Sequence, residues 1–370
     1  MTSGSSLSEG MFWLVMVGLP LTSYGQNAPR VAPVPGDPLE LATGPIQSAD
    51  TPAKREAVLQ LLARARNSYA LRNLRQPWDL KVHFTADSFG RTNYDGGWEM
   101  EDVFAPGQGV HWTASTAGYS ITGIFATNET YAEGTARVIP LRLQEARAML
   151  FDPIASIAYA NSGSIRTSPA SFQGTPVLCL LMARSRNVSN PPAGRSWDET
   201  EECIDPQSGL LHVHSEAPGR YTVYDYKNAP HLGSHLLPRT VTITEGGKVV
   251  SKISVESLQT ISSFDPNLFV PTDRMKSAGP AIAMTSATKI SRIQGQGPFT
   301  SSMIVRPVCV FGIITPAGHL AEAHSLQPSD PNSEAAVKDA EAIDLSPSIA
   351  AGTRPRQHFV FVIEKFVSPQ

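Results

Sequence analysis

Four histidines are the residues whose type and spacing best suit chemistry. His212 and His214 stand two apart in a segment with strand periodicity, so their side chains share one face of that strand. His231 and His235 follow along the chain, and carboxylates such as Glu216 are close to them in sequence. Imidazole and carboxylate groups bind zinc, and a zinc site needs three or four such donors that converge. The pattern is compatible with a metal-dependent enzyme, and it equally fits surface histidines in a loop-rich stretch.

Other catalytic signatures are missing from the sequence. The chain has no G-x-S-x-G, no H-E-x-x-H, no Gly-rich phosphate loop and no C-x-x-C. We therefore expect no enzymatic activity, no cofactor and no metal ion. The net charge is -3, from 30 Lys and Arg against 33 Asp and Glu, so the sequence offers no strongly basic surface for nucleic acid.

The three cysteines indicate one disulfide and one free thiol in an oxidising compartment. Cys179 and Cys203 lie in neighbouring segments with strand character, so we expect them to form the pair. Cys309 lies in an apolar segment, where we expect a buried and unreactive thiol.

The N-terminus predicts export. Residues 11–21 form a continuous apolar run, which is shorter than the roughly twenty residues that a membrane-spanning helix needs. Small residues follow at Ser23 and Gly25, as in a signal peptide that is cleaved before Gln26. The residues before the run carry no Lys or Arg, which is unusual for such a signal. We predict a signal peptide over residues 1–25 and a periplasmic or secreted mature protein.

Changes in composition divide the rest of the chain into four parts. Residues 26–51 are rich in Pro and indicate a linker. Residues 52–272 begin with an amphipathic helix and continue as a long run of antiparallel strands. Residues 273–302, rich in Ala, Ser, Thr and Gly, indicate a second linker, and residues 303–370 show the order strand, strand, helix, strand. We expect an α+β fold: a helix with an antiparallel open β-barrel, followed by a small ββαβ domain.

The long run of strands has features of a known family. A helix at 56–69 precedes the first strand, and the run closes with Leu-Pro-Arg at 237–239, a hairpin, and the stretch 264–271. In these features residues 52–272 resemble the LolA-like periplasmic lipoprotein carriers. The resemblance implies an incomplete β-barrel around a hydrophobic cavity for acyl chains. The residues that would line this cavity are Trp78, Leu80, Val82, Phe84, Trp98, Met100, Phe104 and Trp112.

The same eight residues have a second interpretation. Aromatic and aliphatic side chains that alternate with polar ones are typical of any strand that covers a closed core. The alternation alone does not distinguish an open cavity from a packed interior.

The C-terminal part resembles a second family. A strand ending at Phe311-Gly312, a turn at 315–318, the Ser-Asp-Pro-Asn of 329–332 before a helix, and a strand at 358–363 are similar to the C-terminal domain of TonB-type energy transducers. The resemblance implies a domain that docks a partner by strand addition. The strand expected to dock consists of Phe359, Val360, Phe361, Val362 and Ile363.

These features together predict a non-catalytic binding or carrier protein of a bacterial cell envelope, with a link to outer-membrane transport. Its expected partners are a lipid or acyl chain and an envelope protein that meets the C-terminal strand. One alternative is a structural or sensory component whose barrel is packed and holds no ligand. The other is a metal-dependent enzyme that uses His212 and His214.

Overall fold

The structure is a computed structural model of the chain. The residues that it describes are 30–31, 45–89, 94–126, 129–136, 138–184, 194–281, 285–294, 304–315, 317–344 and 358–368. The predicted signal peptide and its cleavage site after Gly25 lie outside these ranges. Within them, no helix combines the length and the apolar character that crossing a membrane requires.

Helix α1 (Pro52–Ser68) begins where the sequence predicts. The Thr51 hydroxyl accepts a hydrogen bond from the backbone N–H of Lys54, and Pro52 fills a first-turn position at which no N–H is needed. A short 3-10 turn, η1 (Leu71–Asn73), leads from the helix toward the first long strand. The apolar face of α1 is buried through Val58, Leu61, Leu62 and Ala65.

Most of the chain forms one sheet of thirteen strands, in the order β2-β8-β9-β10-β11-β12-β15-β16-β3-β4-β5-β6-β7. Neighbouring strands in it are antiparallel throughout. A two-stranded hairpin, β13 (His231–Leu232) and β14 (His235–Leu236), lies apart from it. The strands of the large sheet are β2 (Gln47–Ser48), β3 (Trp78–Ala86), β4 (Gly96–Ala105), β5 (Gly109–Thr116), β6 (Tyr119–Ala126), β7 (Glu129–Gly134), β8 (Ser164–Phe172), β9 (Thr175–Ala183), β10 (Thr200–Ile204), β11 (Leu211–Ala217), β12 (Arg220–Asp225), β15 (Thr240–Glu245) and β16 (Lys248–Thr260).

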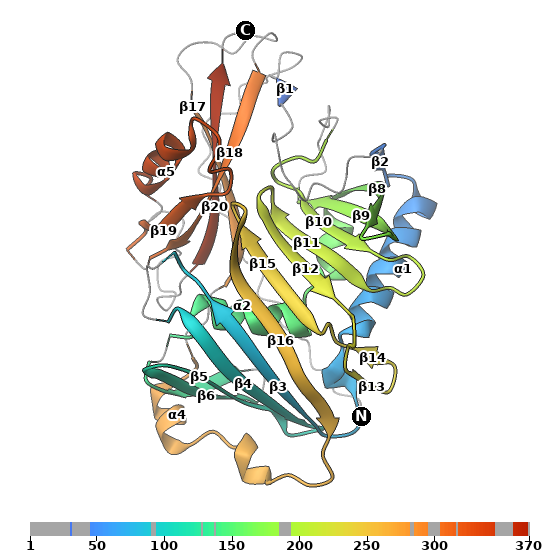
Figure 1. Cartoon of the computed structure of the whole chain (residues 1–370), viewed down its shortest axis with the longest axis vertical. Helices are drawn as coiled ribbons and strands as arrows, with labels where there is room; N and C mark the ends of the chain where they lie inside the picture. The colour runs from blue at the N-terminus through green and yellow to red at the C-terminus, as the bar shows by residue number, and fades with distance from the viewer. Residues whose placement is uncertain are drawn as a thin grey trace, which may run out of the picture.

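The large sheet consists of two wings. The first wing is β3 to β7, and the second runs from β8 through β12 to β15 and β16. They join where β16 pairs with β3, and Figure 1 shows the first wing at lower left and the second at upper right. Strands β2 and β7 stand at opposite ends of the strand order and do not pair with each other. The expected open barrel is therefore corrected to a large antiparallel sheet that does not close.

Two short helices connect the wings. Helix α2 (Leu141–Phe151) and helix α3 (Ile157–Ser162) lie between β7 and β8 in the chain. In Figure 1, α2 lies behind the middle strands. Its residues Leu143, Ala146 and Leu150 are buried in one hydrophobic core with side chains of both wings and of α1. The helices thus cover the inner face of the sheet.

The C-terminal part forms a second, five-stranded sheet. Its strands run in the order β1-β18-β20-β17, with β19 paired to β18, and helix α5 packs on it. The predicted order of strand, strand, helix and strand is confirmed by β18, β19, α5 and β20. The bounds are β1 (Arg30–Val31), β17 (Thr285–Gln294), β18 (Ile304–Ile314), β19 (Leu320–Ser325), α5 (Ser333–Glu341) and β20 (His358–Ser368).

The stretch 273–302, expected to be a linker, contains regular structure. Helix α4 (Asp273–Ala278) has the Thr272 hydroxyl as its N-cap, and β17 pairs in parallel with β20. The predicted docking strand 359–363 lies in β20, between β18 and β17. Both of its edges are thus already paired within the chain. This position contradicts the expectation that Phe359, Val360, Phe361, Val362 and Ile363 dock a partner by adding a strand.

Strand β18 packs on both sides. Val308, Val310 and Ile314 form a small core with α5 and β19. Residues Cys309 and Phe311, on the other face, pack with Leu326 and with two side chains of the large sheet and its helices, Leu141 and Ala217. Cys309 is buried and is not part of the disulfide, as predicted. The two sheets therefore share a packed contact.

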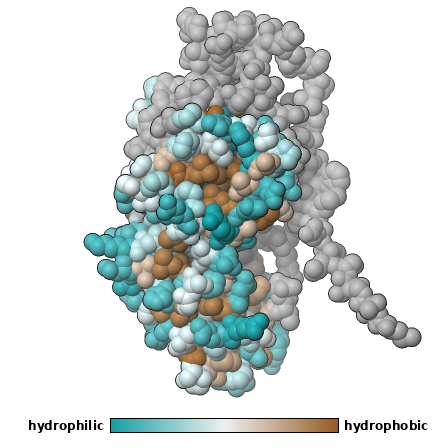
Figure 2. Space-filling view, turned by 90° about the vertical axis from the view of Figure 1, so that its right-hand side faces the viewer, coloured by the Kyte–Doolittle hydropathy of each residue, from teal (hydrophilic) through white to brown (hydrophobic). Residues whose placement is uncertain are grey.

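The surface near α1 is mixed in character. Figure 2 shows hydrophobic residues in several separate areas on that face, with polar residues between them. Elsewhere, the exposed large hydrophobic side chains of the described part are Val249, Leu268 and Val270. The largest apolar side chains lie in the interior, where a ligand site must be sought.

Candidate ligand pocket and the polar groups beside it

The eight residues predicted to line a cavity all lie on the inner face of the first wing. Each of them is at most 7% exposed. The Trp78 ring stacks on Phe104 and Phe151, with centroids 5.4 and 5.9 Å apart, and Phe84 stacks on Trp98 at 5.4 Å. The side chains lie together in one core cluster, as Trp78, Leu80, Val82, Phe84, Trp98, Met100, Phe104 and Trp112. That they enclose a space for a ligand remains a prediction.

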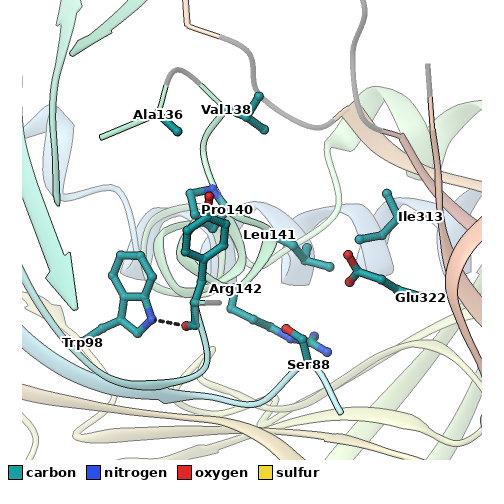
Figure 3. A pocket seen from close by; sticks show the side chains of 10 residues that line it. Ser88, Trp98, Ala136, Val138, Pro140, Leu141, Arg142, Ile313 and Glu322 are labelled. Carbon is teal, nitrogen blue, oxygen red and sulfur yellow. Dashed lines mark hydrogen bonds between the residues drawn. The ribbon is translucent and has the colours of Figure 1, made fainter. Parts of the chain in front are cut away.

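One pocket opens beside this cluster, with a volume of about 280 Å³. Trp98 is the member of the eight that lines it, and the Trp98 indole N–H is bonded to the backbone carbonyl of Tyr94, 2.9 Å away (Figure 3). The remaining wall comes from the segment before α2, the first turn of α2, and the C-terminal sheet. The lining residues are Ser88, Tyr94, Trp98, Ala136, Val138, Pro140, Leu141, Arg142, Ile313 and Glu322.

The C-terminal sheet closes one side of this pocket. Ile313 of β18 and Glu322 of β19 face the Leu141 side of it (Figure 3). Glu322 has a φ of 56°, in the left-handed region that non-glycine residues seldom adopt. The C-terminal part thus contributes to a site that it shares with the large sheet.

An ionic cluster lies next to the pocket, and we call it the Glu245 cluster: Glu245, Arg142, Arg220, Glu145 and His324. The Glu245 carboxylate accepts bonds from both Arg142 Nη atoms at 2.8 and 2.9 Å and from Arg220 Nε at 2.8 Å. His324 Nε2 lies 3.0 Å from its second oxygen. Both arginines also bond Glu145. The cluster joins β15, α2, β12 and β19, so it fastens the C-terminal sheet to the large one.

Electrostatics favour the charged form of Glu245. Burial alone would raise the pKa of this carboxyl, but the charges of Arg142 and Arg220 outweigh burial and hold its pKa well below the ordinary value. The guanidinium groups of Arg142 and Arg220 also lie over the Phe311 ring, at 6.0 and 5.0 Å from its centroid.

A second acid–arginine pair lies on the inner face of the first wing, and we call Asp102, Arg147 and Trp112 the Asp102 centre. Arg147 Nη2 of α2 donates to Asp102 Oδ1 of β4 at 2.5 Å. The Arg147 guanidinium lies 4.3 Å from the centroid of the Trp112 ring. Three buried atoms of the centre have no hydrogen-bond partner among the described residues: Asp102 Oδ2, Arg147 Nε and Trp112 Nε1.

The Asp102 carboxyl differs electrostatically from that of Glu245. Burial raises its pKa above the ordinary value, and the charges of Arg147 and Arg72 offset this only in part. Burial likewise lowers the pKa of Arg147. Both charged groups are therefore held in surroundings that solvate them poorly.

Sequence reasoning missed this centre, although a signal was present. Asp102 occupies the inner-face position between Met100 and Phe104, where the alternation calls for an apolar residue, and it is 0% exposed. A carboxylate on the apolar face of a strand needs a partner, and the partner sits on a helix far along the chain.

The predicted histidine site does not assemble among the described residues. The His212 ring lies 6.1 Å from Phe172 and 5.7 Å from Tyr226, while His214 Nδ1 is 3.7 Å from Glu202 Oε1. His235 in the separate hairpin lies 3.0 Å from a backbone oxygen of α1. In the described part, one group of three metal-ligating residues comes together: Cys179, Glu201 and Cys203.

That group is not a metal site, because its two sulfurs are bonded to each other. Cys179 and Cys203 face each other across β9 and β10 and form the predicted disulfide. Over it, Arg195 is buried and bonds Glu201 Oε2 at 3.2 Å and Ser215 Oγ at 2.7 Å. The end of the segment that joins β9 to β10 is therefore packed against the outer face of the second wing.

Comparisons with known proteins identify no family for this chain. No protein-family model matches the chain, and no curated protein matches it. Solved structures with partial likeness include a DUF1329 family protein from Desulfovibrio piger, at TM-score 0.38 and 7% identity, covering 58% of this chain and 96% of that one. A LolA superfamily protein from Nitrosomonas europaea gives TM-score 0.34 and 9% identity, covering 57% and 96%.

A third likeness, to LprF from Mycobacterium bovis, gives TM-score 0.24 and 11% identity, with 57% of this chain and 97% of that chain covered. The structural neighbours thus include LolA superfamily proteins, and the TonB-like resemblance of the C-terminal part is not supported. At these scores the likeness carries no argument about function, which must come from the site itself.

Proposed function

We propose that this chain is an exported, non-catalytic carrier that binds a lipid or acyl chain in the pocket beside Trp98. The observation that carries the proposal is the pocket of about 280 Å³, with walls that are mostly aliphatic and aromatic. Small-molecule sites are concave, mostly apolar, and on the order of 300–1,000 Å³ in volume. An acyl chain suits such walls because it needs few polar partners.

The position of the pocket supports the same proposal. Trp98 lines the pocket, and its ring stacks on Phe84 of the aromatic inner face. The inner-face side chains therefore lie directly behind this wall of the pocket. The disulfide between Cys179 and Cys203 supports an oxidising compartment, which agrees with export.

A structural role without a ligand is the rival function, and it has its own support. The eight inner-face side chains are nearly fully buried, and several are stacked on one another. If they fill a closed core, removing the Trp98 side chain costs about 3–5 kcal/mol of unfolding free energy, and no apolar ligand binds.

A dye titration with a matched pair of variants tests the proposal. Val138 lines the pocket, whereas Val270 is 53% exposed and is not among the lining residues. We expect N-phenylnaphthylamine to bind the wild-type protein, and Val138→Trp to weaken binding by about tenfold, a loss of roughly 1.4 kcal/mol. Val270→Trp adds the same bulk at the surface and should leave binding unchanged.

The opposite results support the structural role. Absence of dye binding to the folded wild-type protein, together with a severe loss of stability in Trp98→Ala, overturns the carrier proposal. Equal binding by both tryptophan variants shows that the dye binds outside the pocket and overturns it as well.

A further inference from the structure

We propose that the Asp102 centre binds the carboxyl group of a free fatty acid, whose chain runs along β4 to the pocket beside Trp98. This inference rests on the proposed function, and it adds the class of ligand and the residues that recognise it. The centre consists of Asp102 on β4, Arg147 on α2 and Trp112 on β5.

The first support is the set of polar atoms without partners. Asp102 and Trp112 are both 0% exposed, yet Asp102 Oδ2 and Trp112 Nε1 have no hydrogen-bond partner among the described residues, and neither does Arg147 Nε. Native proteins leave few buried polar atoms unpaired, and each such atom calls for an explanation, such as a bound group or a water molecule. These three atoms belong to side chains that contact one another, and we infer that one bound group pairs with all three.

The second support is that the centre is held in a fixed arrangement. The Asp102 carboxylate and the Trp112 ring both contact Arg147. The Trp112 ring also packs against the backbone of β6 at Gly123, where an added Cβ would lie only 2.0 Å from it. Any side chain at Gly123 would therefore displace the ring, so the indole N–H is held in place.

The third support is chemical complementarity. The unpaired set offers two N–H donors, from Arg147 and Trp112, and one carboxylate acceptor, from Asp102. A carboxylic acid fits this set, because its carbonyl oxygen accepts two bonds and its O–H donates one. An acyl ester supplies the carbonyl but no O–H, so the Asp102 oxygen would stay unpaired.

The charges near Asp102 agree with this ligand. The charged and titratable groups that face it are Arg147 on α2, Arg72 in η1 and His111 on β5. Arg72 also interacts with the Asp152 carboxylate, so the charges nearby are balanced, and a fatty acid that enters with its proton adds no further charge. Burial raises the pKa of Asp102, so the pair of carboxyl groups can share one proton.

In this proposal the chain of the ligand follows the inner face of β4 to the pocket. Asp102 and Trp98 are four residues apart on the same face of β4, which corresponds to about 13 Å. Met100 lies between them and is 3% exposed. Its unbranched, flexible side chain is the one that an entering acyl chain displaces.

The test compares a fluorescent fatty acid, cis-parinaric acid, with its methyl ester on the full-length protein. We expect the acid to bind the wild-type protein about tenfold more tightly than the ester at pH 6, the size expected for one added hydrogen bond to a charged group. Asp102→Asn should remove most of this preference, since it deletes the acceptor of the O–H. Trp112→Phe should weaken the binding of both probes alike, since it deletes a donor to the carbonyl that both carry and keeps the ring.

The matched control is Trp78→Phe. The Trp78 indole N–H is already bonded to the Leu71 carbonyl at 3.0 Å, so its loss should leave the affinities for both probes unchanged.

A pH series adds a readout that a purely structural role would not change. The preference of the wild-type protein for the acid should decline as the pH rises from 6 to 9, because the shared proton is lost. Asp102→Asn supplies an N–H in place of the acceptor, so its preference should not depend on pH.

The outcomes separate the two proposals. If neither probe binds, the proposed function fails. If both bind with equal affinity to the wild-type protein, or if Trp112→Phe leaves both affinities unchanged, the carrier function stands and the carboxyl site is overturned, with water occupying the centre.

Discussion

Helix α2 carries two arginines, and each of them bonds a buried carboxylate. The two carboxylates differ in whether both of their oxygens have hydrogen-bond partners. Arg142 belongs to the Glu245 cluster, in which both oxygens of Glu245 are bonded. Arg147 belongs to the Asp102 centre, where one carboxylate oxygen and two N–H groups are unpaired in the described structure. The first carboxyl has a lowered pKa and the second a raised one. Among the described residues Arg142 Nε and Arg147 Nε both have no hydrogen-bond partner, so the difference lies in the carboxylates. A carboxylate with both oxygens bonded suits a structural fastening, whereas one with an unpaired oxygen leaves a place for a further group.

The comparison predicts that substitution of Glu245 causes the largest loss in the free energy of unfolding. Glu245→Gln leaves Arg142 and Arg220 with an uncompensated buried charge, so we expect a loss of about 3–5 kcal/mol in the free energy of unfolding at pH 7. Chemical denaturation followed by tryptophan fluorescence measures it. A change within about 0.5 kcal/mol, as is usual for surface substitutions, would contradict the fastening role.

A smaller effect is expected at His324, which brings β19 to the same carboxylate. His324→Ala removes one bond to a charged group, so we expect a loss of about 1.5–3 kcal/mol. His319→Ala is the matched control, because His319 is exposed in the neighbouring turn. Equal stability of the two variants would show that the C-terminal sheet does not depend on the cluster.

The smallest change in the free energy of unfolding is expected at Asp102, and there the substitution should stabilise the protein. A raised pKa means that folding favours the protonated carboxyl, so the charged form is a cost at neutral pH. Asp102→Asn imitates the protonated form, and we expect it to be slightly more stable than the wild-type protein at pH 7. A destabilisation as large as that of Glu245→Gln would remove the distinction between the two sites.

The two carboxyls also predict opposite pH dependence. Stability from Glu245 is present above its unfolded pKa, about 4.3, and is lost as the pH falls through the lower folded value. The penalty from Asp102 disappears as the pH falls through its raised folded value. Urea titrations from pH 7 to pH 3 should therefore show the deficit of Glu245→Gln shrinking, and the advantage of Asp102→Asn disappearing.

Local patterns in the sequence predicted local structure well. Thr51 and Pro52 predict the start of α1, and the alternation after Trp78 predicts the inner face. Strand character around Cys179 and Cys203 predicts the disulfide. Each depends on residues close together in the chain or on the period of one strand.

Long-range relations were not predictable in the same way. The stretch containing β17 has the Ala, Ser and Thr of a linker, and its strand state depends on parallel pairing with β20, far along the chain. The sequence also did not show which strands lie at the edges of a sheet. Strand β20 was therefore predicted to dock a partner, although β17 and β18 of this chain pair with its two edges. Asp102 and Arg147 likewise form their pair only once α2 lies on the first wing.

The seam between the wings constrains the order in which the protein can fold. The earliest long strand, β3, pairs along its length with the last strand of the large sheet, β16, so that Trp78 meets Thr260. A growing chain that has made only β3 to β7 therefore has an unpaired strand edge, and closing the seam requires a contact of very high sequence separation. Folding of the large sheet must wait until nearly all of it has been synthesised. For a chain that is exported unfolded, this delay keeps it competent for translocation.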